Sequence, residues 1–292
     1  MTDNTRAAVL IMVAMTVVCI NDAIIKHLTA LISLGQLLAL RGLFVVAVLV
    51  LLIRYSGRRV FDGRLLQRAN LLRSVCDTLA VVCYVAGLSF LALPVAATLA
   101  WTSPIILTLL ALVVLRERVD GLRWLAVSLG FAGIVLVVQP WGADWNWKVV
   151  LPFLTAVLGA SRDLITRYVD HRLHALQLTL VPMVLLSLVG AGMAMFDWQP
   201  LAWTHAAWLL LSALCLALAY PCMIVAIRIG ELSFIAPFHF TGILVAVALG
   251  YLLWNDFPND LMWCGISCIV IAGIVIYRRG NASQPAAGRT TS

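Results

Sequence analysis

Long apolar runs recur along the whole chain, and short polar segments separate them. A helix of about 20 apolar residues spans a bilayer, and ten runs of that order cover residues 7–29, 34–53, 71–90, 94–115, 121–139, 148–168, 175–195, 203–228, 232–254 and 260–277. The runs lack a two-residue alternation, and an open sheet facing lipid would leave backbone groups unbonded. The pattern therefore predicts an all-α integral membrane protein with ten transmembrane helices.

The two halves of the chain resemble each other. Residues 21–28 (NDAIIKHL) align with residues 162–169 (RDLITRYV), and further matches follow in order at nearly the same offset. Each half holds five predicted helices, an odd number, so the second half enters the membrane from the opposite side. Inverted repeats of this kind are typical of secondary transporters. We predict two inverted five-helix repeats, residues 1–140 and 141–279, followed by a disordered cytoplasmic tail over 280–292.

Composition and charge agree with a membrane protein. Hydrophobic residues make up 63% of the chain and charged residues 11%, whereas soluble domains contain roughly 45–50% and 25%. The formal net charge is +7, but most of the 20 lysines and arginines fall in the short segments that share a side with both termini. This bias indicates the cytoplasmic side of a multi-pass protein and not a nucleic-acid partner.

The sequence contains no motif for ATP, a metal ion or hydrolysis. It has no GxxxxGKS/T, HExxH or GxSxG segment, and its seven cysteines form no CxxC pair. We therefore expect no cofactor and no bound metal. One grouping suggests a membrane-embedded enzyme that acts on lipid head groups: Asp163, Asp170, His171 and His174. A solvated, charged loop explains that grouping better, so we expect that the protein is not an enzyme.

Charged residues within spans are the main candidates for function. Each costs roughly 2.5–3.5 kcal/mol at the centre of a spanning helix, so it needs a partner, water or a role. Asp22 and Lys26 are four residues apart on one predicted helix, and Asp163 and Arg167 are four apart on another. Residues at that spacing share a helix face. We expect each pair to form a local ion pair.

The inverted repeats also suggest two gates. Glu117 ends the fourth predicted helix on the inner side, and Asp256 ends the ninth on the outer side. We hypothesise that Lys26–Asp256 closes the outer mouth and that Arg167–Glu117 closes the inner mouth, in alternation. The competing interpretation is that these four residues are helix-end charges in the head-group region.

Two further charges lie deeper. Arg41 is about one-third of the way in from the outer side, where a guanidinium suits a carboxylate, phosphate or carbonyl of a substrate. Its alternative role is a structural pair with Asp22 or Asp77. Asp77 could itself take a proton or pair with Arg73 one turn away, and the sequence favours the pairing.

Aromatic and titratable residues complete the expected substrate site. Pro237 invites a kink in the ninth helix, next to Phe238 and His239. The histidine could contact substrate or couple protons, or it could be a neutral core residue. Flat rings could stack a heterocycle, although packing between helices is their commoner role. The predicted substrate-binding residues are Arg41, Tyr84, Trp101, Tyr220, Phe238 and His239.

A longer set of residues resembles a known family. The set comprises residues 93–98 (LPVAAT), Pro104, Arg116, Glu117, Arg118, Trp124, Gly130 and Gly133, with Asn21, Asp22, Lys26 and Arg41. Over about residues 6–278 it resembles the EamA-type transporters of the drug/metabolite transporter superfamily. Asn21-Asp22 and Pro237-Phe238 are most similar to the subgroup that takes up S-adenosylmethionine or riboflavin, in which an arginine often stands in place of His239. The resemblance implies a bacterial inner-membrane facilitator or exchanger without a bound cofactor.

We therefore expect a secondary transporter that moves a small organic metabolite by alternating access. The expected cargo is heterocyclic or zwitterionic, such as riboflavin or S-adenosylmethionine, and the subgroup resemblance favours uptake. Export of amino acids or toxic metabolites is the alternative within this class, and a non-transporting receptor is an alternative outside it. The partners are the substrate and the bilayer, and the sequence leaves a monomer or a homodimer open.

Overall fold

The computed structural model describes most of the chain. It covers residues 3–103, 105–106, 110, 121–139, 146–166, 169, 173, 175–195, 197–229, 238 and 241–282. The regular structure in these residues is entirely helical. The α-helices are α1 (Asp3–Thr29), α2 (Leu34–Tyr55), α3 (Arg68–Leu88), α4 (Leu93–Ala100), α6 (Gly121–Val138), α7 (Val150–Thr166), α8 (Ala175–Met193), α9 (Trp203–Ile229), α11 (Thr241–Trp254) and α12 (Asp260–Ala282), and two short 3-10 helices are η1 (Gly63–Leu66) and η2 (Trp147–Val149).

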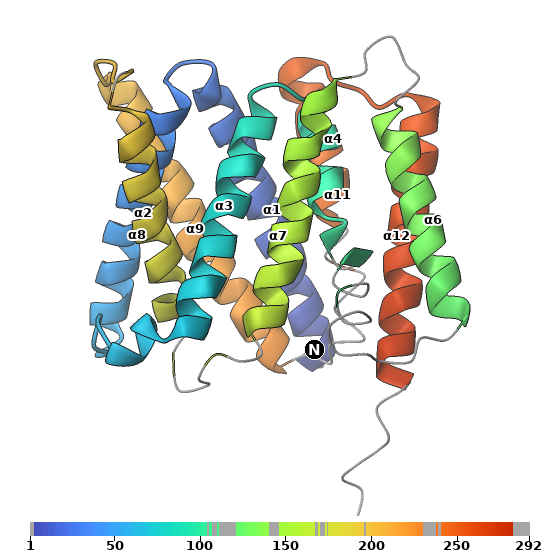
Figure 1. The fold of residues 1–292 in the computed structure, drawn as a ribbon, viewed down its shortest axis with the longest axis horizontal. Helices are drawn as coiled ribbons and strands as arrows, with labels where there is room; N and C mark the ends of the chain where they lie inside the picture. The colour runs from blue at the N-terminus through green and yellow to red at the C-terminus, as the bar shows by residue number, and fades with distance from the viewer. Residues whose placement is uncertain are drawn as a thin grey trace, which may run out of the picture.

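The helices run up and down in one bundle (Figure 1). Within the described residues, six helices are long and apolar enough to cross a membrane, namely α1, α2, α3, α7, α8 and α9, and shorter apolar stretches occur in α6, α11 and α12. Large apolar side chains also face outward, since Leu188 is 64% exposed and Leu252 is 74% exposed. Such an exterior fits lipid as the surrounding solvent. The predicted all-α membrane fold is confirmed.

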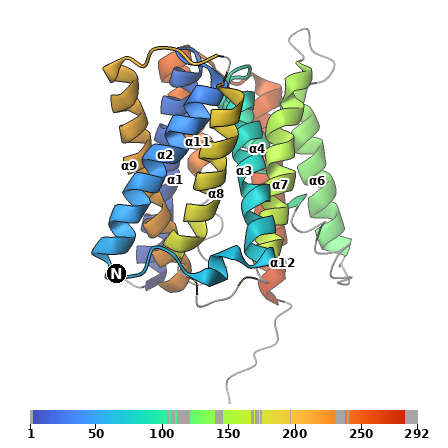
Figure 2. The same ribbon diagram turned by 60° about the vertical axis from the view of Figure 1, so that its left-hand side comes forward.

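Helix pairing follows the predicted two-fold relation between repeats. The first repeat contributes α1, α2, α3, α4 and α6, and the second contributes α7, α8, α9, α11 and α12. The most extensive contacts join α1 with α9, α3 with α7, α2 with α8 and α6 with α12, and α4 also contacts α11. Exchanging the repeats maps the first pair onto the second and each other pair onto itself. Figure 2 shows α2 beside α8, and the α6–α12 pair lies at the opposite edge (Figure 1).

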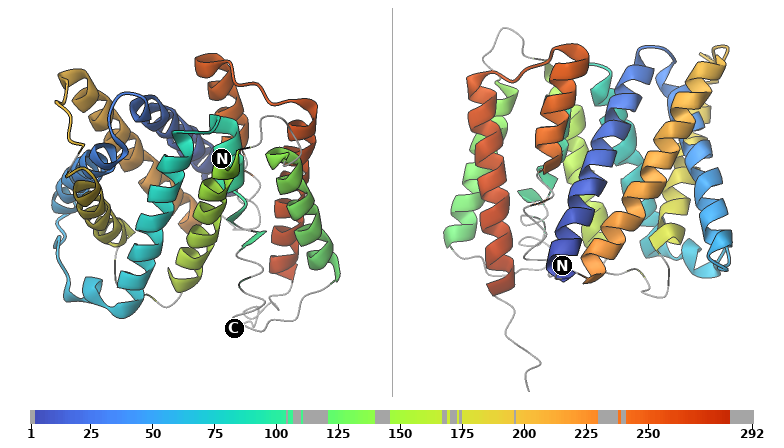
Figure 3. Two further views of the ribbon diagram at one scale, coloured as in Figure 1. Left: turned by 45° about the horizontal axis from the view of Figure 1, so that its top comes forward. Right: turned by 180° about the vertical axis from the view of Figure 1, so that it is seen from behind.

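The repeats are inverted relative to each other. The chain enters α1 and leaves α12 at the same end of the bundle (Figure 3), which we call the terminal face. On this face Leu65 packs with Val169 and Leu173, and Gln177 Nε2 donates a 2.9 Å hydrogen bond to the Arg59 carbonyl. Segments near residues 60 and 170 therefore lie on one side, as an odd number of helices per repeat requires.

Small residues allow the paired helices to approach closely. A Cβ atom added to Gly133 of α6 would lie 2.7 Å from the carbonyl oxygen of Gly265 in α12, and the reverse holds for Gly265. A side chain at either position would separate the helices. The α12 helix continues to Ala282, three residues into the segment predicted as the tail, and residues 283–292 lie outside the described part.

Candidate functional site

A buried arginine lies at the centre of the candidate site. Arg41 belongs to the second turn of α2, on the face that also buries Leu37 and Leu38, and only 7% of the residue is exposed. Its Nε atom is buried and has no hydrogen-bond partner among the residues that the structure describes. An unpartnered guanidinium nitrogen in a dry interior is costly. A bound group that accepts a hydrogen bond from this Nε atom would remove that cost.

A buried carboxylate faces the same region from α1. Asp22 is 6% exposed. Its Oδ2 atom accepts a 2.9 Å hydrogen bond from the Tyr84 hydroxyl of α3, and its Oδ1 atom accepts a 3.1 Å bond from Asn21 Nδ2. Asn21 Oδ1 in turn accepts a 2.6 Å bond from the Ser212 hydroxyl of α9. Three helices thus fix the carboxylate in place.

Arg41 completes a cluster that we call the central site: Asp22, Arg41, Tyr84 and Tyr220. The guanidinium interacts electrostatically with Asp22 and with both tyrosines. The sequence offered Asp22 and Asp77 as possible partners of Arg41. The guanidinium interacts with Asp22, although no hydrogen bond joins the two among the described side chains. The site combines a cation, an anion and two phenols drawn from α1, α2, α3 and α9. Such a set suits a polar molecule that carries both hydrogen-bond acceptors and donors.

The other predicted ring residues that the structure describes, Trp101 and Phe238, lie next to the end of α4 and the start of α11. Thr102 Oγ1 donates to the Leu99 carbonyl at 2.7 Å just beyond α4, and Thr241 Oγ1 donates to the Phe238 carbonyl at 2.6 Å at the start of α11. These two bonds are related by the repeat, 139 residues apart. Trp101 precedes Thr102 in the chain, and its ring packs on Gly242, which follows Thr241.

Trp101 occupies a slot that a glycine provides. Its indole packs so tightly on Gly242 of α11 that an added Cβ atom would overlap the ring. Trp101 and Phe238 also pack against one apolar cluster that includes Ile11 and Met15 of α1. The structure thus brings Trp101 and Phe238 together, but no described contact joins either to Arg41.

An ion pair lies at the face of the bundle opposite the termini. Lys26 Nζ of α1 lies 3.0 Å from Asp256 Oδ2, which follows α11, and it also lies 4.5 Å from the ring centre of Trp254. The expected local pair between Lys26 and Asp22 is not formed. Asp22 is directed into the core toward Tyr84, whereas the longer lysine side chain extends to the helix end. The contact named as the outer gate is therefore present, and its gating role stays a prediction.

A second ionic network joins α3 and α7. Arg162 Nη1 lies 2.9 Å from Asp77 Oδ1, and Arg162 Nε donates a 2.9 Å bond to Asp163 Oδ1. The expected pairing of Asp77 with Arg73 is wrong. Arg73 donates instead to Thr166 Oγ1 and to a carbonyl of α8, each at 3.1 Å. Packing of α3 on α7 brings Arg162 to Asp77, and helical spacing alone could not show this.

Some predicted residues cannot be placed. Arg167, Glu117 and His239 lie outside the described residues, as do Asp170, His171 and His174. The inner gate, the local Asp163–Arg167 pair and the role of the histidine therefore stay predictions. Within the described part of the chain, no three His, Cys, Asp or Glu side chains gather in a way that could hold a metal ion.

Known proteins share this sequence pattern over nearly the whole chain. The EamA-like transporter family matches residues 5–139 and 146–278, once in each half. A riboflavin transporter of Rhizobium johnstonii is 31% identical over 211 residues, which are 72% of this chain and 70% of the relative. An S-adenosylmethionine uptake transporter of Rickettsia prowazekii is 21% identical and covers 88% of this chain and 87% of its own.

A pseudopaline exporter, CntI of Pseudomonas aeruginosa, is also similar. It is 24% identical and covers 89% of this chain and 91% of its own. The three relatives transport different small metabolites, and none is named as an enzyme. This chain belongs to the EamA-like transporter family of the drug/metabolite transporter superfamily, and it is a multi-pass membrane transporter of a small metabolite.

Proposed function

We propose that this protein takes up riboflavin, or a flat heterocycle very similar to it, across the bacterial inner membrane. The observation that carries the proposal is the buried Arg41 nitrogen without a partner, set beside Asp22 and two tyrosines. A flavin ring carries two carbonyl oxygens on either side of an N–H group. Arg41 can donate to a carbonyl and Asp22 can accept from the N–H, while Tyr84 and Tyr220 offer ring faces. The similarity to a riboflavin transporter supports the same cargo.

The distribution of positive charge supports an orientation. Exposed arginines gather on the terminal face: Arg6, Arg54, Arg58, Arg59 and Arg68. Among the described residues, Lys26 and Lys148 are the lysine and arginine side chains near the opposite face. Because positively charged loops stay in the cytoplasm, the terminal face is cytoplasmic in this proposal. Both termini then lie in the cytoplasm, and the central site loads from the outside during uptake.

The ion pair at the opposite face then acts as the outer gate. Lys26 and Asp256 come from α1 and from the α11–α12 connection, which belong to different repeats. Nearby, an added Cβ atom on Gly250 of α11 would lie 2.7 Å from Pro94 of α4, so these helices also meet closely here. Alternating access requires such contacts to form and break in turn. In this proposal the described arrangement is closed to the outside.

Flux through the purified protein tests the proposal. Wild-type protein in proteoliposomes should exchange external radiolabelled riboflavin for internal unlabelled riboflavin with saturation. Arg41→Ala removes a charged hydrogen-bond donor, which is worth roughly 1.5–3 kcal/mol, or 10- to 150-fold in affinity. Arg54→Ala, at the exposed end of the same helix, is the matched control and should leave flux unchanged. Absence of saturable wild-type flux, or equal flux in Arg41→Ala, would overturn the proposal.

Export is the competing direction, because the similarity to a pseudopaline exporter extends over 89% of this chain. The same vesicles address it when riboflavin is placed on one side only and net flux is followed with and without a proton gradient. Cells that require external riboflavin for growth give the complementary measurement. Growth rescue at low riboflavin supports uptake, whereas faster loss of preloaded flavin without rescue supports export.

A further inference from the structure

The ionic network between α3 and α7 has no role in the function proposed above. We call Asp77, Arg162 and Asp163 the inner cluster. The Asp77 side chain is buried, at 7% exposed, whereas those of Arg162 and Asp163 are 32% and 44% exposed. The guanidinium uses Nη1 for Asp77 and Nε for Asp163, so its described bonds leave Nη2 unused. A polar ligand could therefore reach the cluster without first breaking these bonds.

The repeat provides a direct comparison for this cluster. Asn21 Nδ2 donates to the next residue, Asp22, in the first repeat. Arg162 Nε donates to the next residue, Asp163, in the second repeat. Each polar residue also bonds to the paired helix, the first to Ser212 of α9 and the second to α3. The two repeats thus share this arrangement of hydrogen bonds. The contact with the paired helix is between neutral groups in the first repeat (Asn21 and Ser212) and between charged groups in the second (Arg162 and Asp77).

The two aspartates also differ in how far they are enclosed. Asp22 is covered by the Tyr84 hydroxyl. The position that corresponds to Tyr84 in the second repeat, 139 residues later, is Met223, which has no hydrogen-bond donor. Asp163 accordingly keeps 44% of its side chain exposed. Packing alone explains the closed pair in the first repeat. An open and charged version in the second repeat is better explained by contact with something polar.

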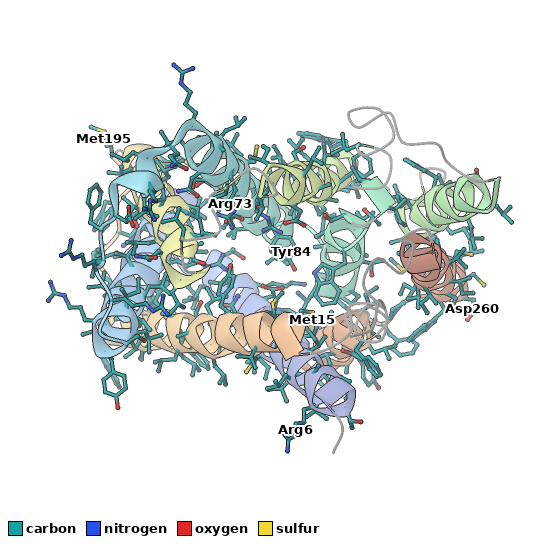
Figure 4. All side chains as sticks on the ribbon, turned by 90° about the horizontal axis from the view of Figure 1, so that it is seen from below. Arg6, Met15, Arg73, Tyr84, Met195 and Asp260 are labelled. Atoms are coloured by element: carbon teal, nitrogen blue, oxygen red, sulfur yellow. The ribbon has the colours of Figure 1, made fainter. Side chains whose placement is uncertain are left out.

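The inner cluster and the central site lie along one line. Asp77 and Tyr84 are seven residues apart on α3, so they share a face and are separated by about 10 Å along the helix. Tyr220 of α9 lies within electrostatic range of Arg41 of the central site, of Asp77 and Arg162 of the inner cluster, and of Arg73. Seen from the terminal face, Tyr84 and Arg73 of α3 lie along the central region between α3 and α9 (Figure 4). One elongated molecule could contact both groups of residues.

We propose that the inner cluster binds the polyhydroxyl tail of the substrate whose ring is held at the central site. The inference rests on the proposed function and deepens it, because it assigns the selection between tailed and bare rings to a separate set of residues. Hydroxyl groups both donate and accept hydrogen bonds. They can donate to the carboxylates of Asp77 and Asp163 and accept from Arg162 Nη2. A ring without this tail can contact Arg41 but forms no bonds with the inner cluster, which water then solvates.

The expected selectivity is moderate. A site whose buried groups depend on substrate hydroxyls for their bonds rejects the analogue strongly. The inner cluster differs, since its charges already satisfy one another and two of its side chains are partly exposed. We expect riboflavin to bind about tenfold more tightly than lumiflavin, which has the same ring with a methyl group in place of the ribityl chain.

Binding of these two flavins to purified protein, followed by calorimetry, tests the inference. Arg162→Gln and Asp77→Asn should each weaken riboflavin binding, leave lumiflavin binding unchanged and reduce the preference to about threefold or less. Arg41→Ala should weaken both flavins and keep the preference. Arg68→Gln is the control, because this arginine also lies on α3 but is exposed at the start of the helix. It should keep the preference.

The ratio of two dissociation constants on one preparation does not depend on the fraction of protein that is folded. If Arg162→Gln and Asp77→Asn fail to fold, Asp163→Asn changes only a partly exposed carboxylate and should still lower the preference. An unchanged ratio in the cluster variants, or equal binding of both flavins by the wild type, would overturn the inference and leave the proposed function standing. Binding of neither flavin by the wild type would overturn the proposed function itself.

Discussion

The ion pair between Lys26 and Asp256 allows a quantitative test of alternating access. Its N–O distance is 3.0 Å, and its side chains are 12% and 32% exposed. A charge-assisted hydrogen bond contributes roughly 1.5–3 kcal/mol, and the lower part of that range applies because Asp256 is partly exposed. The ring of Trp254, 4.5 Å from Lys26 Nζ, adds a cation–π contact. Loss of the pair should therefore shift the equilibrium between closed and open outer faces roughly 10- to 30-fold.

Charge reversal tests this estimate. Lys26→Asp and Asp256→Lys each place two like charges at the contact, so the outer face should stay open and riboflavin exchange in proteoliposomes should fall by about tenfold. The double variant restores opposite charges and should recover most of the exchange. Recovery will be incomplete, because a lysine at position 256 loses the contact with Trp254.

Lys148 supplies the matched control for this experiment. It is a lysine near the same face, and it lies over the Phe90 ring at 3.2 Å and not at an acidic partner. Lys148→Asp changes the surface charge equally but leaves the ion pair intact, so exchange should remain at the wild-type level. Should the double variant exchange no faster than either single variant, the two residues are helix-end charges and the gate does not exist.

Two further predictions follow from packing and topology. Gly242→Ala should displace the Trp101 indole, lower the free energy of unfolding by about 1–3 kcal/mol and reduce exchange. Gly192→Ala is the control and should change neither, because an added Cβ atom there meets nothing within 4 Å. Equal melting temperatures for the two variants would contradict the packing of Trp101 on Gly242. A cysteine in place of exposed Arg58, in a cysteine-free background, should resist an impermeant maleimide in intact cells and react after lysis. Labelling in intact cells would refute the proposed orientation.

Symmetry reasoning identified one long-range contact that local rules missed. The inverted repeat suggested that a cation and an anion meet at each mouth, and Lys26 does contact Asp256, 230 residues away. The four-residue rule suggested local partners for Asp22 and Asp77, and both suggestions fail. A helix face determines which residues are neighbours on that helix, but a buried charge bonds to the strongest partner that any packed helix brings to it.

Arg162 shows what a closer comparison of the repeats could have found. It aligns with Asn21, and both donate to the aspartate that follows. The shared position was visible in the alignment, and it indicated that Arg162 faces the paired helix as Asn21 does. The identity of the partner was not visible, because Asp77 aligns with Leu216, which has no charge.

The number of helices, the inverted repeat and the placement of the chain in a membrane could all be predicted from the amino-acid sequence. These features follow from the bilayer, whose thickness sets the length of a span and whose interior forces backbone bonds to close within each helix. The folded structure was needed to show which charges meet, that Arg41 Nε has no partner among the described residues and that the Trp101 ring packs on Gly242. Such contacts depend on distances between helices far apart in the chain, and no local periodicity encodes those distances.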